Sequence, residues 1–251
     1  PNKIKKLDFL WIVIFGFIGY YLASYLDFLG LQYIKAGLER IILFIYPTLV
    51  WIISKLVFKT TISLKQIVAI LITYFGVLIA FWGELNFQNS NVAFGGFLVF
   101  LSALTYAIYL VGSGWLIPKF GVVKFTSYAM LVSCLFVFIH FSLTSNSSIF
   151  GHSWQVYFLG FLIAIFATVI PSYLVSISIK MISSSNFAIV AGIGPISTII
   201  LATIFLDESL TLLQLFGAIV VIIGIIWIPI MANISGVLYE YLQKVQSYIA
   251  P

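Results

Sequence analysis

The sequence YLDFLGLQYIKAGLERIILFIYPTLVW, Tyr25 to Trp51, decides the fold class, because it joins two long apolar runs and still carries charges. Asp27, Glu39 and Arg40 stand among its aromatic and aliphatic residues. A charged side chain near the middle of a membrane-spanning helix costs roughly 3 kcal/mol on insertion scales, so it is expected to face a partner or a water-filled cavity. The first question is therefore whether the chain spans a membrane.

The composition identifies a polytopic membrane protein. Of its 251 residues, 63% are hydrophobic and 8% charged, and the mean hydropathy is +1.19. So little polar surface excludes an ordinary soluble globule. A membrane-spanning helix needs roughly 20 apolar residues. The stretches that qualify are about 9–33, 37–58, 64–83, 93–116, 123–143, 155–181, 186–206 and 212–232. The predicted fold class is an all-α membrane protein, a polytopic helical bundle.

The distribution of basic residues predicts the orientation, because short cytoplasmic loops collect Lys and Arg. Of the twelve basic residues, only Lys35 and Arg40 fall on the side opposite the two termini. We therefore expect both termini to be cytoplasmic and the protein to lie in the inner (cytoplasmic) membrane of the cell. No basic patch with interleaved aromatic residues is present in the sequence, so nucleic acid is not an expected partner.

Polar residues form stripes on three of the predicted helices. Spacings of three and four residues bring side chains to one face of a helix. The stripes are Gly16, Tyr20, Ser24 and Asp27 in the first span, Ser102, Tyr106, Tyr109 and Ser113 in the fourth, and Thr168, Ser172, Ser176 and Lys180 in the sixth. A single stripe of this kind either bonds a neighbouring helix or faces water. Three stripes together with a buried acid favour a shared polar cavity.

Prolines interrupt three of the predicted spans, at Pro47, Pro171 and Pro195. Proline removes a backbone hydrogen bond and kinks a helix, which a membrane tolerates only where neighbours or cavity water satisfy the freed carbonyl. We interpret these prolines as hinges rather than as direct ligand contacts.

The chain also contains an internal repeat at an offset of about 148 residues. Sliding Ser24–Gly76 onto Ser172–Gly224 aligns Pro47 with Pro195 and Gln66 with Gln214. The copies lie five spans apart, an odd number, so they are inserted in opposite orientations. An inverted repeat is typical of alternating-access transporters. We expect a partial first repeat of three helices at 1–83, a second repeat of five helices at 93–232, and an amphipathic tail at 233–251. The mismatch predicts two further helices before Pro1 and a fold of ten.

The chain resembles the drug/metabolite transporter superfamily, in particular its bacterial EamA-type members. The resemblance rests on Phe205 to Gly217, FLDESLTLLQLFG, followed by Gly224, which matches the family's Glu, Leu, Gln, Gly, Gly pattern, and on the opening stretch at Tyr25. It covers about residues 8–232. It implies ten helices in two inverted five-helix units, a central cavity, and movement of small metabolites. Cavity-lining helices of the family correspond here to the first, second, fourth, sixth and seventh spans.

The strongest candidate site residue is Asp27, which would bind a cationic substrate group, exchange a proton to couple transport, or serve as a structural carboxylate bonded to a tyrosine or to Arg40. Glu39 and Arg40 begin the second span and either join this site or extend into the interface. The second copy has Val175 in place of Asp27. The charges are thus not required by the repeat and are the expected location of specificity.

Aromatic and hydroxyl side chains complete the candidate site. The tyrosines offer surfaces for a small organic substrate, or else pack between helices and at the interface. The remaining candidates are Tyr25, Tyr46, Tyr106, Tyr109, Ser172, Tyr173 and Ser176.

The single cysteine and the two histidines suggest no reaction chemistry. Cys134 is expected to be a small buried residue, and His140 and His152 have no metal ligand at suitable spacing. An intramembrane enzyme would need a nucleophile with a base, and a channel would need a recurring ring of groups. We therefore expect no cofactor and no metal.

The predicted function is a secondary transporter that moves a small organic metabolite, amino-acid-like or drug-like, across the membrane, with export as the direction. Its expected partners are that small-molecule substrate, a coupling proton and the lipid bilayer. The alternative is a non-transporting structural or regulatory subunit. The sequence leaves the substrate, the coupling ion and the oligomeric state open.

Overall fold

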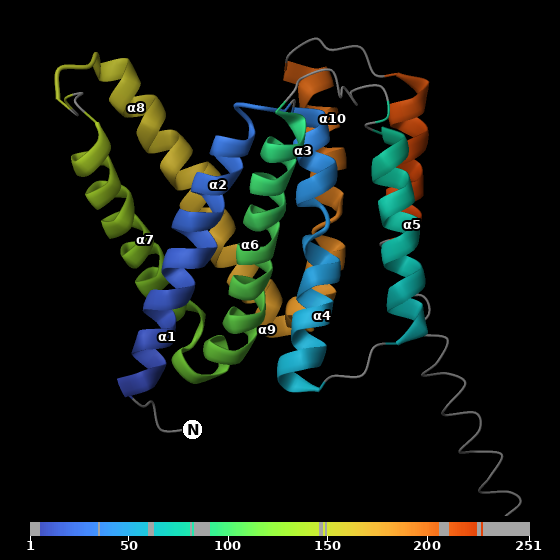
Figure 1. Cartoon of the computed structure of the whole chain (residues 1–251), viewed down its shortest axis with the longest axis horizontal. Helices are drawn as coiled ribbons and strands as arrows, with labels where there is room; N and C mark the ends of the chain where they lie inside the picture. The colour runs from blue at the N-terminus through green and yellow to red at the C-terminus, as the bar shows by residue number, and fades with distance from the viewer. Residues whose placement is uncertain are drawn as a thin grey trace, which may run out of the picture. The chain divides into compact units, whose positions relative to one another are not determined.

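The computed structural model describes residues 6–34, 36–59, 63–80, 82, 91–145, 148, 150–205, 211–224 and 227, and this part of the chain contains helices and no strand (Figure 1). The elements are α1 (Lys6–Gly16), η1 (Phe17–Leu22), α2 (Ala23–Gly30), α3 (Ala36–Leu43), α4 (Tyr46–Phe58), α5 (Leu64–Ala80), α6 (Val92–Phe120), α7 (Val122–Thr144), α8 (Trp154–Leu162), η3 (Ile163–Val169), α9 (Ile170–Val190) and α10 (Ile193–Phe205), followed by the helix Leu212–Gly224.

Five helices in the described part are long and apolar enough to cross a membrane. They are Lys6–Gly30, Leu38–Phe58, Val92–Phe120, Val122–Thr144 and Trp154–Val190. Two shorter apolar helices, Ile67–Ala80 and Leu212–Gly224, lie where further spans were predicted. The predicted all-α membrane fold is confirmed. The predicted tail at 233–251 and the loop with Asp207 and Glu208 lie outside the described residues.

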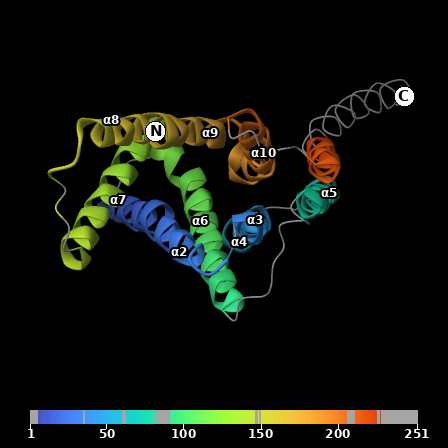
Figure 2. The same ribbon diagram turned by 90° about the horizontal axis from the view of Figure 1, so that it is seen from above.

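The chain forms two compact units, and the first comprises residues 1–59 and 86–188. Within it α6 is the central helix, because α1, η1, α2, α3, α4 and α7 all pack against it. Figure 2 shows α6 between α2 and α4. Small residues allow the close approach: Gly30 and Gly95 face one another across the contact of α2 with α6, where no Cβ would fit. Ser102 of α6 donates a hydrogen bond of 2.8 Å to the carbonyl oxygen of Ala23.

The second unit comprises residues 60–85 and 189–251. In it α5 packs on the helix Leu212–Gly224 through glycine contacts, since a Cβ on Gly217 would lie 2.5 Å from the backbone nitrogen of Ala80. Thr211 and Gln214 form a capping box at the start of that helix, with the Gln214 backbone N–H donating to the Thr211 hydroxyl at 3.2 Å and the Thr211 N–H donating to the Gln214 side-chain oxygen at 3.0 Å.

The helix interruptions also recur along the chain. In the first copy a turn at Phe44 and Ile45 separates α3 from α4, and Pro47 lies in the first turn of α4. In the second copy a turn at 191–192 separates α9 from α10, and the backbone places Pro195 in the first turn of α10. Proline is favoured there because the first N–H groups of a helix have no intrahelical partner. The side chain of Pro195 lies outside the described residues.

The predicted boundary between the spans 155–181 and 186–206 coincides with a break in the helical backbone. α9 extends to Val190, but Ser183 within it has φ 73° and ψ 160°, so two helical segments meet there. A positive φ is unfavourable for a residue with a side chain, so this position marks a local break in the helix. A second interruption, the turn at 191–192, lies within the predicted span 186–206, shortly before Pro195.

Two π-helical segments occur in the first unit, η1 and η3, at nearly the repeat offset from one another. Ile170 follows η3 directly, and Pro171 is the second residue of α9. Because proline has no N–H to donate to the carbonyl four residues earlier, a widened turn before Pro171 is expected. Short π-helical segments frequently occur at functional sites.

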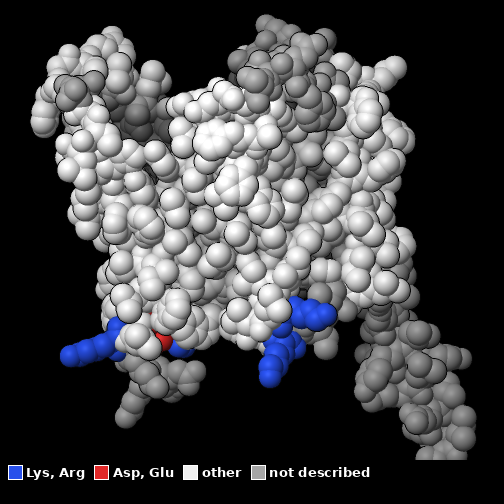
Figure 3. All heavy atoms as spheres, viewed as in Figure 1, with Lys and Arg blue, Asp and Glu red and all other residues white. Residues whose placement is uncertain are grey.

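Basic side chains on the face shown in Figure 3 gather at its lower end, where α1 and α7 begin and α4 and α6 end. There Lys119 donates a hydrogen bond of 2.8 Å to the buried carboxylate of Asp8, and its ammonium lies 4.1 Å from the centre of the Trp115 ring. This ion pair joins the start of α1 to the end of α6.

Candidate functional site

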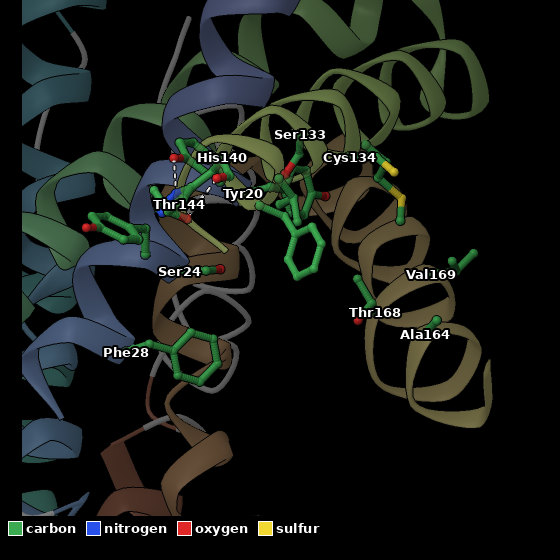
Figure 4. Close-up of a pocket in the computed structure, with 15 residues that line it drawn as sticks. Tyr20, Ser24, Phe28, Ser133, Cys134, His140, Thr144, Ala164, Thr168 and Val169 are labelled. Atoms are coloured by element: carbon green, nitrogen blue, oxygen red, sulfur yellow. Dashed lines mark hydrogen bonds between the residues drawn. The ribbon is translucent and has the colours of Figure 1, made fainter. Parts of the chain in front are cut away.

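A cavity of about 720 Å³ lies in the first unit between η1 and α2, α7, and η3. Figure 4 shows Ser133, Cys134 and His140 on one helix, with Ala164 and Thr168 on another. The cavity is lined by Tyr20, Tyr21, Ser24, Tyr25, Phe28, Met130, Ser133, Cys134, Val137, His140, Phe141, Thr144, Ala164, Thr168 and Val169. Its volume falls in the range of ordinary small-molecule sites. Both π-helical segments contribute to its walls.

His140 of α7 contacts two tyrosines of the facing helix where they line the cavity. Its Nδ1 forms a hydrogen bond of 2.6 Å with the hydroxyl of Tyr21 on η1. The ring of Tyr25 on α2 meets the imidazole edge to face, with 4.9 Å between ring centres. Tyr21 and Tyr25 stack with their ring centres 6.2 Å apart. Because Nδ1 is used by Tyr21, the second imidazole nitrogen is the atom with which His140 would bind a ligand.

Tyr20 connects the cavity to a row of buried tyrosines in the helix core. Tyr109 of α6 donates a hydrogen bond of 2.8 Å to the hydroxyl of Tyr20. Tyr106 stacks on Tyr109 with ring centres 6.1 Å apart, and Tyr46 meets Tyr106 at 5.4 Å. The hydroxyl of Tyr46 also donates to the carbonyl oxygen of Ala188, at 3.4 Å. These three predicted site tyrosines thus pack behind the cavity wall, and Tyr20 is the ring that reaches it.

The predicted residues of the sixth span form hydrogen bonds within their own span and to α7. Ser172 donates to the backbone oxygen of Thr168 at 2.7 Å, and Ser176 accepts a hydrogen bond of 2.7 Å from Thr126 of α7. Tyr173 shares a hydrogen bond of 2.7 Å with Ser127. Ser176 and Tyr173 thus join α9 to α7, and Thr168 is the member of the predicted stripe that lines the cavity.

The charged residues of the opening stretch form a separate cluster. The carboxyl of Asp27 on α2 lies beside that of Glu39 on α3, and the Arg40 guanidinium is close to both. Arg40 Nε is 3.3 Å from Glu39 Oε2. The side chain of Glu39 is only 2% exposed, whereas that of Arg40 is 44% exposed. Oδ1 of Asp27 is buried and has no hydrogen-bond partner among the described residues.

The burial of Glu39 shows that its carboxyl does not extend into the interface, and Arg40 is the exposed member of the pair. Adjacent residues on a helix point about 100° apart, but the long arginine side chain still reaches its neighbour. None of the three charged residues lines the cavity.

The structure therefore divides the predicted site into parts. Of the predicted residues, Tyr25 lines the cavity directly, the other tyrosines and the serines support the surrounding helices, and the charges form their own cluster. The expectation that Cys134 is a buried core residue is wrong, because its side chain is exposed and lines the cavity.

Sequence reasoning missed His140 as a cavity residue, although a signal was present. Met130, Ser133, Val137, His140 and Thr144 recur at spacings of three and four, which brings them to one face of α7. This stripe mixes polar and apolar residues, so it does not stand out as a stripe of hydroxyl groups.

The long apolar helices define a broad class, a multi-pass membrane protein. The EamA-like transporter family model matches residues 1–82 and 93–229. The chain belongs to this family. Its members are transporters and not enzymes, in agreement with the prediction.

Relatives and a solved structure support the same family and fold. The chain is 31% identical over 223 residues to the uncharacterized transporter YcbK of Bacillus subtilis, covering 86% of this chain and 71% of the relative. It is 25% identical over 226 residues to an uncharacterized transporter of Archaeoglobus fulgidus, covering 89% and 79%. One crystal structure has a TM-score of 0.74 at 13% identity, covering 89% of this chain and 77% of the other, and it shows the fold alone.

Proposed function

We propose that this transporter moves a small organic metabolite across the membrane by alternating access, and that the cavity beside His140 is where the metabolite binds. The observation that carries the proposal is a cavity of about 720 Å³ lined by aromatic and aliphatic side chains of three helices, with a few polar groups among them. Protein interiors are close-packed, so a space of this size is unusual inside one. The cavity therefore has the size and the chemistry of a ligand site.

The internal repeat supports the alternating-access part of the proposal. The two π-helical segments, the two helix-starting prolines and the two turns recur at nearly one offset along the chain. We interpret 1–83 as a partial first repeat and 93–232 as the second, inserted in the opposite sense. Discontinuous helices at matching places in two inverted halves are the usual marker of a transport site. Pro47, Pro171 and Pro195 would then be the hinges.

The proposed orientation follows from charge. The basic ends of α1, α4 and α6 would face the cytoplasm, so both ends of the chain would lie on that side of the inner membrane. Because the cavity lies towards the opposite ends of α2 and α7, it would open away from the cytoplasm in this conformation. Such an opening suits release of an exported compound, and export is the proposed direction.

Transport itself is tested by reconstituting the protein in liposomes loaded with a bacterial metabolite pool. We expect at least one metabolite to leave the protein-containing liposomes faster than protein-free ones, and mass spectrometry of the external medium detects it. A non-transporting subunit, the alternative function, predicts equal loss from both preparations. Equal loss for every metabolite and for both directions of a proton gradient would contradict the proposal.

The Asp27→Asn variant tests whether the charged cluster couples transport to a proton. We expect turnover driven by a proton gradient to fall by more than about tenfold, while exchange of substrate without a gradient continues, because an amide cannot take up and release a proton. The pair of rates is measured in the same liposomes. Tyr33→Phe, a neutral change close to α2, serves as the control. A gradient-driven rate that is unchanged in a folded Asp27→Asn protein would exclude a coupling role.

A further inference from the structure

The described residues that line the cavity beside His140 include no Asp, Glu, Lys or Arg, and the cluster of Asp27, Glu39 and Arg40 does not reach its surface. An ionised group that enters such a cavity loses part of its hydration, and no carboxylate, lysine or arginine of the described wall replaces it. The wall thus discriminates against amino acids and other molecules with full charges.

The same wall offers aromatic faces. The ring of Phe28 is 70% exposed and that of Tyr25 is 42% exposed, and both border the cavity. Figure 4 shows the Phe28 ring on the helix opposite Ala164 and Thr168. Aromatic side chains with free faces stack on flat, unsaturated ligands.

A few polar side chains complete the lining. His140, with its Nδ1 bonded to Tyr21, has a second ring nitrogen for a ligand, and the hydroxyls of Ser133 and Thr168 border the space from α7 and η3. One or two neutral groups placed in an apolar pocket fix the orientation of a ligand without requiring it to carry charge.

From these three features we infer that the cavity selects an uncharged aromatic molecule carrying a hydrogen-bonding group, such as an amide or hydroxyl, and that His140 determines this specificity. The inference rests on the proposed function and narrows its substrate class. Of the two substrate types that the sequence allowed, drug-like and amino-acid-like, it favours the drug-like type.

The test compares two ligands that share an indole ring and differ in charge, N-acetyl-L-tryptophanamide and L-tryptophan. Each is titrated into the purified protein and the melting temperature is recorded, because a ligand that binds the folded state raises it by mass action. We expect the uncharged amide to raise the melting temperature at concentrations more than about tenfold below those at which tryptophan does, a ratio that corresponds to about 1.4 kcal/mol.

Variants test whether the rise in melting temperature depends on binding at His140. His140→Ala should remove most of the shift produced by the amide, and Tyr21→Phe should weaken it, because the imidazole loses the hydrogen bond that orients it. The control is Ser142→Ala, two residues from His140 on α7, exposed and outside the cavity lining. It should leave the shift unchanged.

Three results would overturn the inference. The first is that tryptophan binds as tightly as the amide, and the second is that neither compound raises the melting temperature. The third is that the amide still raises the melting temperature of both the His140→Ala protein and the Ala164→Trp protein, in which the cavity is filled. These are distinct from failure of the proposed function. If the liposomes export a zwitterionic amino acid, transport stands and the substrate class is wrong. If no compound is exported while the amide binds at His140, the site stands and transport is wrong.

Discussion

A Gly16→Leu variant is expected to give almost no folded protein. Gly16 of α1 lies against α7 so closely that a Cβ would be 2.6 Å from the backbone oxygen of Ala129 and 3.0 Å from its Cα. Ala129 is fully buried, so α7 would have to move as a whole. Even one methyl group forced into a packed contact costs roughly 1–3 kcal/mol, and a leucine adds three further carbons.

The measurement is the yield of monodisperse protein by size-exclusion chromatography after extraction from membranes. Leucine is more apolar than glycine, so insertion into the membrane should not suffer and a loss reports packing. Gly160→Leu is the matched control, because a Cβ at Gly160 meets nothing within 4 Å. Equal yields from the two variants would show that α1 and α7 do not pack as described.

An Arg40→Met variant is expected to lose stability on the order of 2 kcal/mol, because it leaves two adjacent carboxyl groups without their counter-charge. Glu39 is 2% exposed and its carboxyl faces both Arg40 and Asp27. Removing one partner of a buried ion pair typically costs 3–5 kcal/mol, and the half-exposed position of Arg40 reduces that figure. The midpoint of thermal unfolding in detergent measures the loss.

A double variant that combines Glu39→Gln with Arg40→Met tests whether the loss of stability comes from charge. It removes one of the two carboxyl charges and should recover more than half of the lost stability. A double variant no more stable than Arg40→Met alone would mean that the loss comes from the arginine stem and its packing, and the charge account of the cluster would be wrong.

Much of the membrane fold could be predicted from the sequence, because a bilayer requires apolar helices of a minimum length and such apolar runs are easily recognised in the sequence. Stretches such as 123–143 are recovered almost residue for residue, as Val122–Thr144. Two of the breaks were also predicted. Pro47 indicates the interruption between α3 and α4, and Ser183, which adopts a positive φ, lies in the gap between the spans predicted at 155–181 and 186–206.

The candidate site was predicted less well, because it depends on which helices meet. The stripe through Tyr20 and Ser24 correctly pointed to a polar face of the first span. The stripe through Ser102 and Ser113 bonds to backbone oxygens within and between helices instead. Periodicity predicts which residues share a face of a helix but not which helix packs against that face. It therefore could not predict the hydrogen bond between His140 and Tyr21, which are 119 residues apart.

The central claim is that the transported molecule occupies the cavity between η1 and α2, α7, and η3, and filling that cavity tests it most directly. Ala164 lines the cavity, whereas Ala167 lies on the same π-helical segment, is exposed and does not line it. The measurement is the export rate from liposomes containing Ala164→Trp or Ala167→Trp protein, for whichever metabolite the unmodified protein exports. We predict that Ala164→Trp reduces export to the rate of protein-free liposomes and that Ala167→Trp exports near the unmodified rate. Export at the unmodified rate by a folded Ala164→Trp protein would contradict the account.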